Sequence, residues 1–181
     1  MRVGGAVAVC GLVALLGAAA GAAPAGRISA TPAARLRVHG YPYAARCPAA
    51  GIADRVDRWR MDMCNCTSYV AWALQANGQR IDWFIPGAMN AWNWPHVAQL
   101  GGLRVVRQPR PGMVAVWPEL SPPFGHVAYV TAVEADGGID VSEYNFPPAS
   151  TGRPFRFDQR RDVSPRGAVF IDVPRAGRRS S

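Results

Sequence analysis

The stretch MCNCTSYVAW, residues 63–72, begins the helix that is most clearly predicted in this chain. Over residues 66–77, apolar side chains recur at the spacing of one buried helix face. Asn65 is a favourable N-cap, and the Asn-Gly pair at the other end is a favourable stop. Cys66 therefore falls in the first turn, where free N–H groups and the helix dipole stabilise a thiolate. Position alone is equally compatible with a reactive thiol and with a small residue of the core.

The composition indicates one globular domain rather than a disordered chain. Of the 181 residues, 49% are hydrophobic, which is enough to bury a core. The net charge is +8, and all 20 basic residues are arginine, as expected for a GC-rich genome. Such a charge attracts nucleic acid, anionic wall polymers or a membrane surface. The sequence contains no recognition helix or zinc-finger spacing, so we do not expect nucleic acid as a partner.

The N-terminus has the pattern of a secretory signal peptide. Arg2 precedes an apolar segment at residues 7–16, and small residues with A-x-A spacing follow. The alternative is a membrane anchor, but the apolar segment is shorter than the about 20 residues of a spanning helix. We expect cleavage, a secreted or cell-wall location, and no membrane insertion afterwards. The expected parts are a signal peptide at 1–23, a flexible linker at 24–40, a folded domain at 41–174 and a basic disordered tail at 175–181.

Cleavage changes the cysteine count, because Cys10 leaves with the signal. Cys47, Cys64 and Cys66 remain, and an odd number leaves one thiol unpaired in an oxidising compartment. An unpaired thiol in a secreted protein is a candidate nucleophile. A zinc site would need four ligands at recognisable spacing, and a lone C-x-C does not provide them. We therefore expect no metal and no cofactor.

Two alternating segments, GHVAYVTAV at 125–133 and GIDVSEYNF at 138–146, predict a β-hairpin. A two-residue turn at Asp136-Gly137 would pair Val130 with Glu143 and Ala128 with Asn145. His126 would then share a face with Glu143 and Asn145, and Asn145 would be its diagonal neighbour, about 7–8 Å away. A slip of one residue would move His126 to the opposite face.

Several shorter segments complete the pattern. VAVW at 114–117 predicts a buried strand, and AVFIDV at 168–173 predicts a closing strand. Tryptophans between residues 83 and 94 predict core packing or the wall of a groove. His39 and His96 are expected at the surface or in packing roles.

A cysteine nucleophile needs a base within hydrogen-bond reach and a third group that orients the base. The hairpin supplies His126 as the base, with Glu143 or Asn145 as the third group. The helix that begins at Cys66 supplies N–H groups for an oxyanion.

The motifs CTSYVAW at 66–72, GHVAYV at 125–130 and VSEYN at 141–145 resemble the CHAP family. These are cysteine- and histidine-dependent amidohydrolases and peptidases, and the resemblance covers roughly residues 40–173. It implies an α+β, papain-like fold, with N-terminal helices packed on a small antiparallel sheet or half-barrel. Met113 stands in a strand where the family often has Asp, a residue that we take to be structural.

The resemblance also implies roles for particular residues. Cys66 would be the nucleophile and His126 the general base, with Glu143 and Asn145 orienting the base. Cys47 and Cys64 would then be left to form a disulfide; the alternative is that Cys64 and Cys66 are both buried and reduced.

For function, the resemblance implies a secreted, monomeric enzyme of actinobacterial type that acts on peptidoglycan. Its substrate would be the stem peptide or the cross-bridge, and it would act as an endopeptidase or as an N-acetylmuramoyl-L-alanine amidase. One alternative is a non-catalytic wall- or surface-binding module of the same fold. Another is a secreted amidase or toxin that acts on a different peptide.

Overall fold

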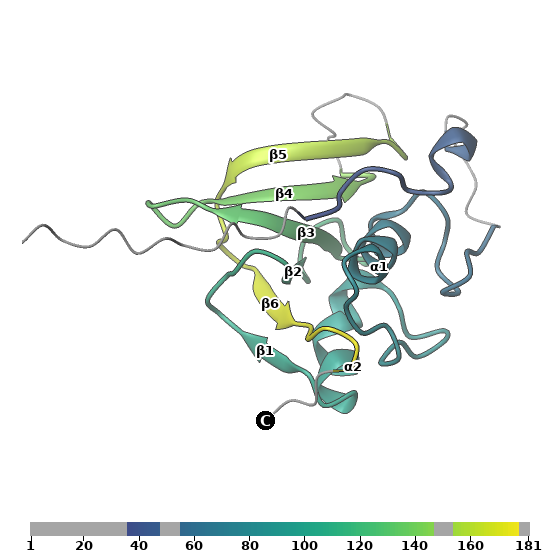
Figure 1. The fold of residues 1–181 in the computed structure, drawn as a ribbon, viewed down its shortest axis with the longest axis horizontal. Coiled ribbons are helices and arrows are strands. Elements are labelled where there is room, and N and C mark those ends of the chain that lie inside the picture. The colour runs from purple at the N-terminus through teal and green to yellow at the C-terminus, as the bar shows by residue number, and fades with distance from the viewer. Residues whose placement is uncertain (1–35, 48–54, 147–153, 178–181) are drawn as a thin grey trace, which may run out of the picture. The chain divides into compact units, whose positions relative to one another are not determined.

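A six-stranded sheet organises the residues that the computed structural model describes, which are 36–47, 55–146 and 154–177. The strand order is β1-β6-β2-β3-β4-β5, and all neighbours are antiparallel (Figure 1). The expected α+β class with a small antiparallel sheet is confirmed. The strands are β1 (Arg104–Val106), β2 (Val114–Trp117), β3 (His126–Val133), β4 (Ile139–Tyr144), β5 (Phe157–Val163) and β6 (Val169–Asp172).

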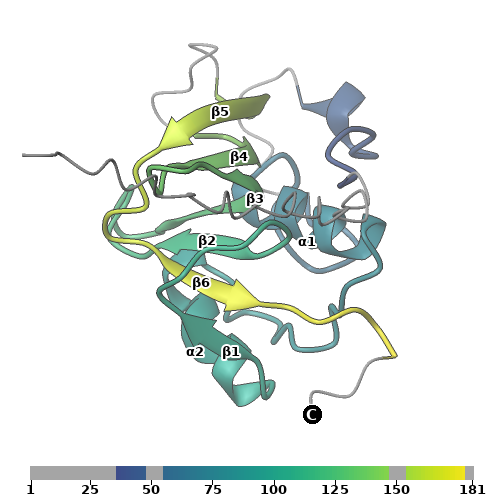
Figure 2. The ribbon, with the colours of Figure 1, turned by 60° about the vertical axis from the view of Figure 1, so that its left-hand side comes forward.

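Two α-helices pack on this sheet. Helix α1 (Cys66–Ala76) contacts β3 and β4, and helix α2 (Trp94–Leu100) contacts β1 and β6 (Figures 1 and 2). The predicted helix at 66–77 is confirmed, with Asn77 as its C-cap. Two short 3₁₀ turns, η1 (Ala44–Arg46) and η2 (Ala91–Asn93), lie in the connections.

The centre of the sheet is buried on both faces, which explains its continuous apolar runs. Every residue of β2 is buried, so the strand predicted at 114–117 is confirmed. On one face, Val127 and Tyr129 belong to a core cluster that includes Tyr69 and Leu74 of α1. A second apolar cluster covers the other face: Met113, Ala115, Trp117, Ala128, Val130, Ile139, Val141, Ala168 and Phe170.

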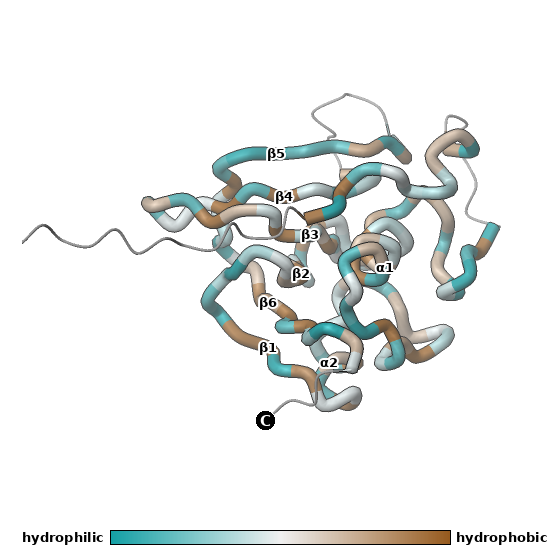
Figure 3. The backbone as a smooth tube through the Cα atoms, viewed as in Figure 1, coloured by the Kyte–Doolittle hydropathy of each residue, from teal (hydrophilic) through white to brown (hydrophobic). Residues whose placement is uncertain are grey.

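The outer strand β5 differs from the others in composition. Its sequence FDQRRDV is hydrophilic along most of its length (Figure 3). Charged side chains on an edge strand discourage pairing with another chain. The period-2 apolar pattern predicts neither β5 nor the short strand β1, whereas the predicted closing strand is confirmed as β6.

The segment before α1 is held against that helix. The Tyr69 hydroxyl donates to the Val38 carbonyl at 2.8 Å, and Asn77 exchanges hydrogen bonds with the backbone of Arg37. Tyr41 is buried, shares a hydrogen bond with Ser68 and accepts the Cys64 N–H at 3.0 Å. The described end of the expected linker, residues 36–40, is therefore attached to the domain.

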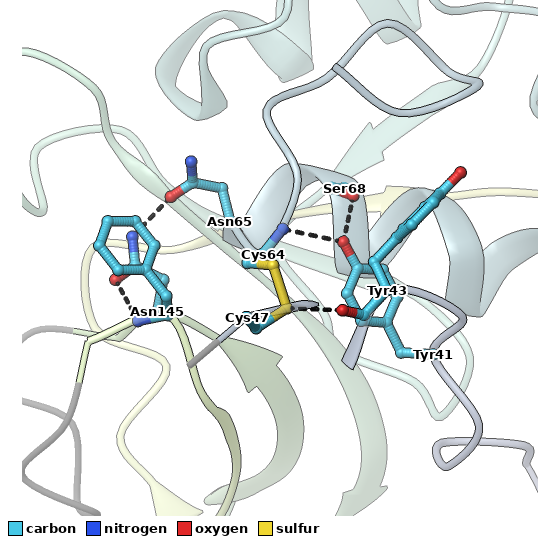
Figure 4. Close-up of a disulfide and its surroundings, with 8 residues drawn as sticks. Tyr41, Tyr43, Cys47, Cys64, Asn65, Ser68 and Asn145 are labelled. Carbon is cyan, nitrogen blue, oxygen red and sulfur yellow. Dashed lines mark hydrogen bonds between the residues drawn. A yellow bond between two sulfur atoms is a disulfide. The ribbon is translucent and has the colours of Figure 1, made fainter. Parts of the chain in front are cut away.

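Cys47 and Cys64 form a disulfide, while Cys66 is a free thiol (Figure 4). The expected pairing is thus confirmed. Cys64 has a positive φ of 65°, and the adjacent Asn65 N–H donates to the Asp62 carbonyl in a turn. The disulfide therefore holds a tight turn two residues before the free sulfur.

The expected signal peptide, most of the expected linker and the end of the expected tail lie outside the described residues. Among the helices that are described, none is long and apolar enough to cross a membrane.

We predict that replacing Cys47 and Cys64 together by serine lowers the free energy of unfolding by about 3 kcal/mol, because the disulfide restricts the unfolded chain. Urea unfolding of the protein without residues 1–23 measures this change. Thiol titration of the same unreduced protein should find one free thiol, and three free thiols would contradict the disulfide.

Candidate active site

Cys66, the first residue of α1, carries the free sulfur. This sulfur interacts with the His126 side chain and accepts hydrogen bonds from the backbone N–H groups of Val127 and Thr67. The start of α1 therefore meets the start of β3. The sequence brings the two together because β3 is one of the strands on which α1 packs.

His126 is 1% exposed and is fixed on several sides. It lies opposite Trp117 on β2, and the Phe146 ring packs edge-on against it at 5.2 Å. Its Nε2 lies 2.7 Å from Oε2 of Glu143. Because Glu143 occupies Nε2, the nitrogen left for Cys66 is Nδ1.

The hairpin register differs from the expected one. Val133 pairs with Ile139, so the loop is longer than a two-residue turn, and a bulge follows between Val130 and Ala132. Beyond the bulge Val130 pairs with Val141, where the expected register has Glu143. The pairing is therefore shifted by two residues. An even shift keeps the same side chains on the same face, so Glu143 still shares the face of His126.

In the observed register, Glu143 takes the position diagonal to His126 that was expected for Asn145. The shift moves Glu143 toward His126, so Glu143 is the group that contacts the imidazole. Asn145 follows the end of β4 and has a positive φ of 53°. Its side chain bonds to Asn65 Oδ1 and accepts the Phe155 N–H at 3.0 Å (Figure 4). Asn145 and His126 line the same groove, but the hydrogen bonds of the Asn145 side chain go to Asn65 and Phe155.

Asn65 occupies the N-cap position, as predicted, but its side chain is used differently. The Oδ1 atom accepts a hydrogen bond from Asn145 instead of capping α1, and the amide nitrogen points away from Asn145 (Figure 4). The first N–H groups of a helix lack intrahelical partners. Because the Asn65 side chain does not cap α1, the first backbone N–H groups of this helix can donate hydrogen bonds to the Cys66 sulfur or to a ligand.

The Cys66–His126 pair favours the charged forms of both groups. Burial alone would raise the pKa of the Cys66 thiol, but the His126 charge and the hydrogen bonds to the sulfur lower it. Burial alone would lower the pKa of His126, but the charges and hydrogen bonds of Cys66 and Glu143 raise it to about 9. A thiolate and an imidazolium can therefore coexist near neutral pH.

Arg160 on β5 is a member of the site that sequence reasoning missed. It forms two hydrogen bonds with the carboxylate of Glu143, and its guanidinium lies 3.6 Å from the centre of the Phe146 ring. Glu143 is fully buried, and burial alone would raise its pKa. The hydrogen bonds from His126 and Arg160, together with their charges, lower it instead. Recognising FDQRRDV as a strand beside β4 would have placed Arg160 on this face.

A groove of about 480 Å³ opens onto Cys66 and His126. One wall is the loop before β3, where the Trp92 N–H donates to the Phe124 carbonyl at 3.0 Å. This approach requires Gly125, which has a φ of +73° and where a Cβ would lie 2.5 Å from the Trp92 nitrogen. The lining residues are Asp62, Asn65, Cys66, Thr67, Asn90, Ala91, Ser121, Phe124, Gly125, His126, Asn145 and Phe155.

The remaining candidates lie elsewhere. His39 and His96 are exposed and do not line this groove, as expected. Of the tryptophans, Trp83 and Trp94 are core residues, whereas Trp92 is 50% exposed. Met113 is buried in the second apolar cluster.

Comparison with known protein families gives a match over the part of the chain that contains this site. A model of the CHAP domain matches residues 56–145, a range that includes Cys66, His126, Glu143 and Asn145. A Staphylococcus aureus protein named "Probable autolysin LDP" is 37% identical over 84 residues. That alignment covers 45% of this chain and 28% of the other protein.

A solved structure is also similar. It is an N-acetylmuramoyl-L-alanine amidase from Staphylococcus aureus, with a TM-score of 0.52 and 23% sequence identity. The match covers 62% of this chain and 31% of that one, and it supports the fold. This chain therefore spans less than a third of either protein.

We predict that Glu143→Gln raises the pKa of the Cys66 thiol. The His126 imidazolium stabilises the Cys66 thiolate, and loss of the carboxylate charge destabilises that imidazolium. The rise in iodoacetamide labelling of Cys66 with pH should therefore begin at a higher pH. Glu134→Gln, at an exposed hairpin position, is the control and should leave the profile unchanged. An unaltered profile in the Glu143 variant would contradict the assignment.

We also predict that Arg160→Met lowers the free energy of unfolding by about 2 kcal/mol at neutral pH, because the buried Glu143 carboxylate loses its cation. The fold lowers the pKa of Glu143, so this carboxylate stabilises the protein above its unfolded pKa. That contribution disappears as the pH falls through its folded pKa, so the difference between the two proteins should shrink between neutral and acid pH. Urea unfolding at both pH values tests this.

The neighbouring Arg161, which is exposed, provides the matched control as Arg161→Met. A loss of stability in the Arg160 variant that is the same at both pH values would show that the guanidinium does not act through Glu143.

Proposed function

Residues 56–145 belong to the CHAP domain family, and from this we propose that the protein is a secreted cysteine hydrolase of bacterial peptidoglycan. It cleaves a peptide or amide bond, with Cys66 as the nucleophile. The observation that carries the proposal is the contact between the unpaired Cys66 sulfur and His126, whose other ring nitrogen bonds to Glu143. These are the nucleophile, base and orienting group that acyl transfer needs.

In the proposed reaction, the Cys66 thiolate attacks the scissile carbonyl carbon and forms a C–S bond. The His126 imidazolium then gives its proton to the leaving nitrogen as the C–N bond breaks. Neutral His126 next removes a proton from water, whose oxygen attacks the thioester. Breakage of the C–S bond releases the acid and restores the thiolate, and the proton is back on His126. Glu143 keeps the imidazole oriented throughout.

The negative oxygen of each tetrahedral intermediate needs donors beside the sulfur. The uncapped start of α1 offers backbone N–H groups there, because Asn145 draws the Asn65 side chain away from the capping role. In this proposal Asn145 acts on the helix start, whereas Glu143 acts on the base. The role of Glu143 is the one that the family resemblance implies, whereas the proposed role of Asn145 at the helix start differs from the base-orienting role expected for it.

Two features support peptidoglycan and an extracytoplasmic location. The similar proteins are named an autolysin and an N-acetylmuramoyl-L-alanine amidase. The Cys47–Cys64 disulfide suits an oxidising compartment, in agreement with the N-terminal signal pattern. Both an endopeptidase and a muramoyl-alanine amidase would use the same acyl-transfer chemistry.

We predict that Cys66→Ala and His126→Ala each abolish the release of soluble fragments from purified cell walls. His96→Ala, at an exposed histidine outside the groove, should retain full activity. Circular dichroism checks that all three variants fold. A fully lytic Cys66→Ala protein would refute the proposed function, and mass spectrometry of the fragments identifies the bond. A wild-type protein that binds walls and releases nothing would instead be a binding module.

A further inference from the structure

The groove at Cys66 differs in charge from the chain as a whole. The chain has a net charge of +8, yet none of the described residues that line the groove is an arginine. Among these lining residues, Asp62 is the only one with a carboxylate. A ligand in the groove therefore meets a negative side chain in a positively charged protein.

The charge of Asp62 is not compensated within the described part of the chain. Glu143 is neutralised by Arg160 and His126, and the Cys66 thiolate is neutralised by the His126 imidazolium. By contrast, no ion pair with Asp62 is found among the described residues. Its surroundings add burial and the like charge of Asp57, and both raise the pKa of Asp62.

The position of Asp62 is fixed by its chain segment. It pairs with Val56 across a short bridge, and its carbonyl accepts the Asn65 N–H at 3.3 Å. The disulfide at Cys64 holds the same turn, and Asp62 lies four residues before Cys66. The backbone of Asp62 is thus held by the same turn that precedes Cys66, and its exposed side chain lines the groove.

An apolar surface lies in the same groove. Phe124 is 60% exposed, and Phe155 also lines the groove. Methylene groups of an alkylamine can pack on such rings while the charged end reaches a carboxylate. A carboxylate that forms no ion pair with the described residues, in a groove lined also by the exposed Phe124 and the half-buried Phe155, fits an aliphatic ammonium group.

We propose that Asp62 binds an ammonium group of the substrate peptide and so selects peptides that carry a free amine near the scissile bond. This inference rests on the proposed function. The amine has two sources in a stem peptide: the side chain of a diamino acid, or an N-terminus freed from the glycan. The carboxylate would recognise the same chemistry in either case.

The test compares peptides with and without the charge. An N-acetylmuramoyl-tetrapeptide with lysine at its third position carries only the side-chain ammonium, and acetylation of that lysine removes it. The corresponding tetrapeptide without the muramoyl group, with its lysine acetylated, carries only the N-terminal ammonium. Its partner is acetylated at both amines. Cleavage of each is followed by chromatography with the wild type and with Asp62→Asn.

We expect Asp62→Asn to lower kcat/KM about tenfold for the amine-bearing member of one pair, and to leave its acetylated partner unchanged. The pair that responds identifies the source of the amine. Asp82→Asn, at an exposed aspartate that does not line the groove, should change neither. High salt should reduce the preference of the wild type, because it screens the ion pair.

Four results would overturn the proposal. Equal losses on charged and acetylated peptides would show that Asp62 acts on the fold, and no loss on any would show that it is a solvated charge. Both leave the proposed function intact, because purified cell walls are digested in parallel. If the wild type cleaves neither the peptides nor the walls, the proposed function fails and this inference fails with it. Cleavage of walls while all four peptides resist would also overturn it, since a free amine would not then be enough for selection.

Discussion

The contact between the first residue of α1 and the first residue of β3 is the interaction on which the rest of the structure depends. Two constraints bring Cys66 and His126 together, one on each side. A disulfide holds the chain two residues before Cys66, and a glycine that no side chain could replace precedes His126. Without the first, the turn before the helix would be free to move. Without the second, the loop that walls the groove could not approach η2. The site is thus positioned by backbone geometry before any charge is considered.

Charge then stabilises what the backbone positions. From Cys66 through His126 and Glu143 to Arg160, the charged forms alternate in sign. A buried charge without a partner is costly, so each member of this row depends on its neighbour. The row ends at Arg160, whose side chain is 20% exposed and lies over Phe146. Water therefore reaches the row at its two ends, at Arg160 and at Cys66 in the groove, while His126 and Glu143 between them are buried. This arrangement explains why charged residues continue a face that is otherwise apolar.

The sequence predicts the helix that begins at Cys66 and the strand that begins at His126, because each depends on local pattern. Helical spacing and an Asn before Cys66 are visible in one short segment, and so is the alternation around His126. The hairpin shows the limit. A bulge does not change the apolar pattern, so the sequence does not predict it. Glu143 stays on the predicted face only because the register is shifted by an even number of residues. Arg160 could not be predicted in this way, since a polar edge strand lacks the period that identifies strands. Likewise, the left-handed backbone at Asn145 redirects a side chain that the strand pattern assigns to the base.

The distribution of charge separates attraction from selection. Arginines on the exterior act over about a Debye length and draw the protein toward any polyanion, with little regard to orientation. A carboxylate in the groove acts only on a group that has already entered, so it discriminates between peptides without opposing the approach. If arginines lined the groove, they would compete with the scissile peptide for contacts to nearby anionic polymer. Keeping them outside leaves the thiolate facing a site that a cationic or neutral peptide can occupy. The positive charge of the exterior and the negative charge of the groove are therefore compatible. The exterior arginines affect how the protein meets its substrate, and the carboxylate affects which peptide bond reaches the sulfur.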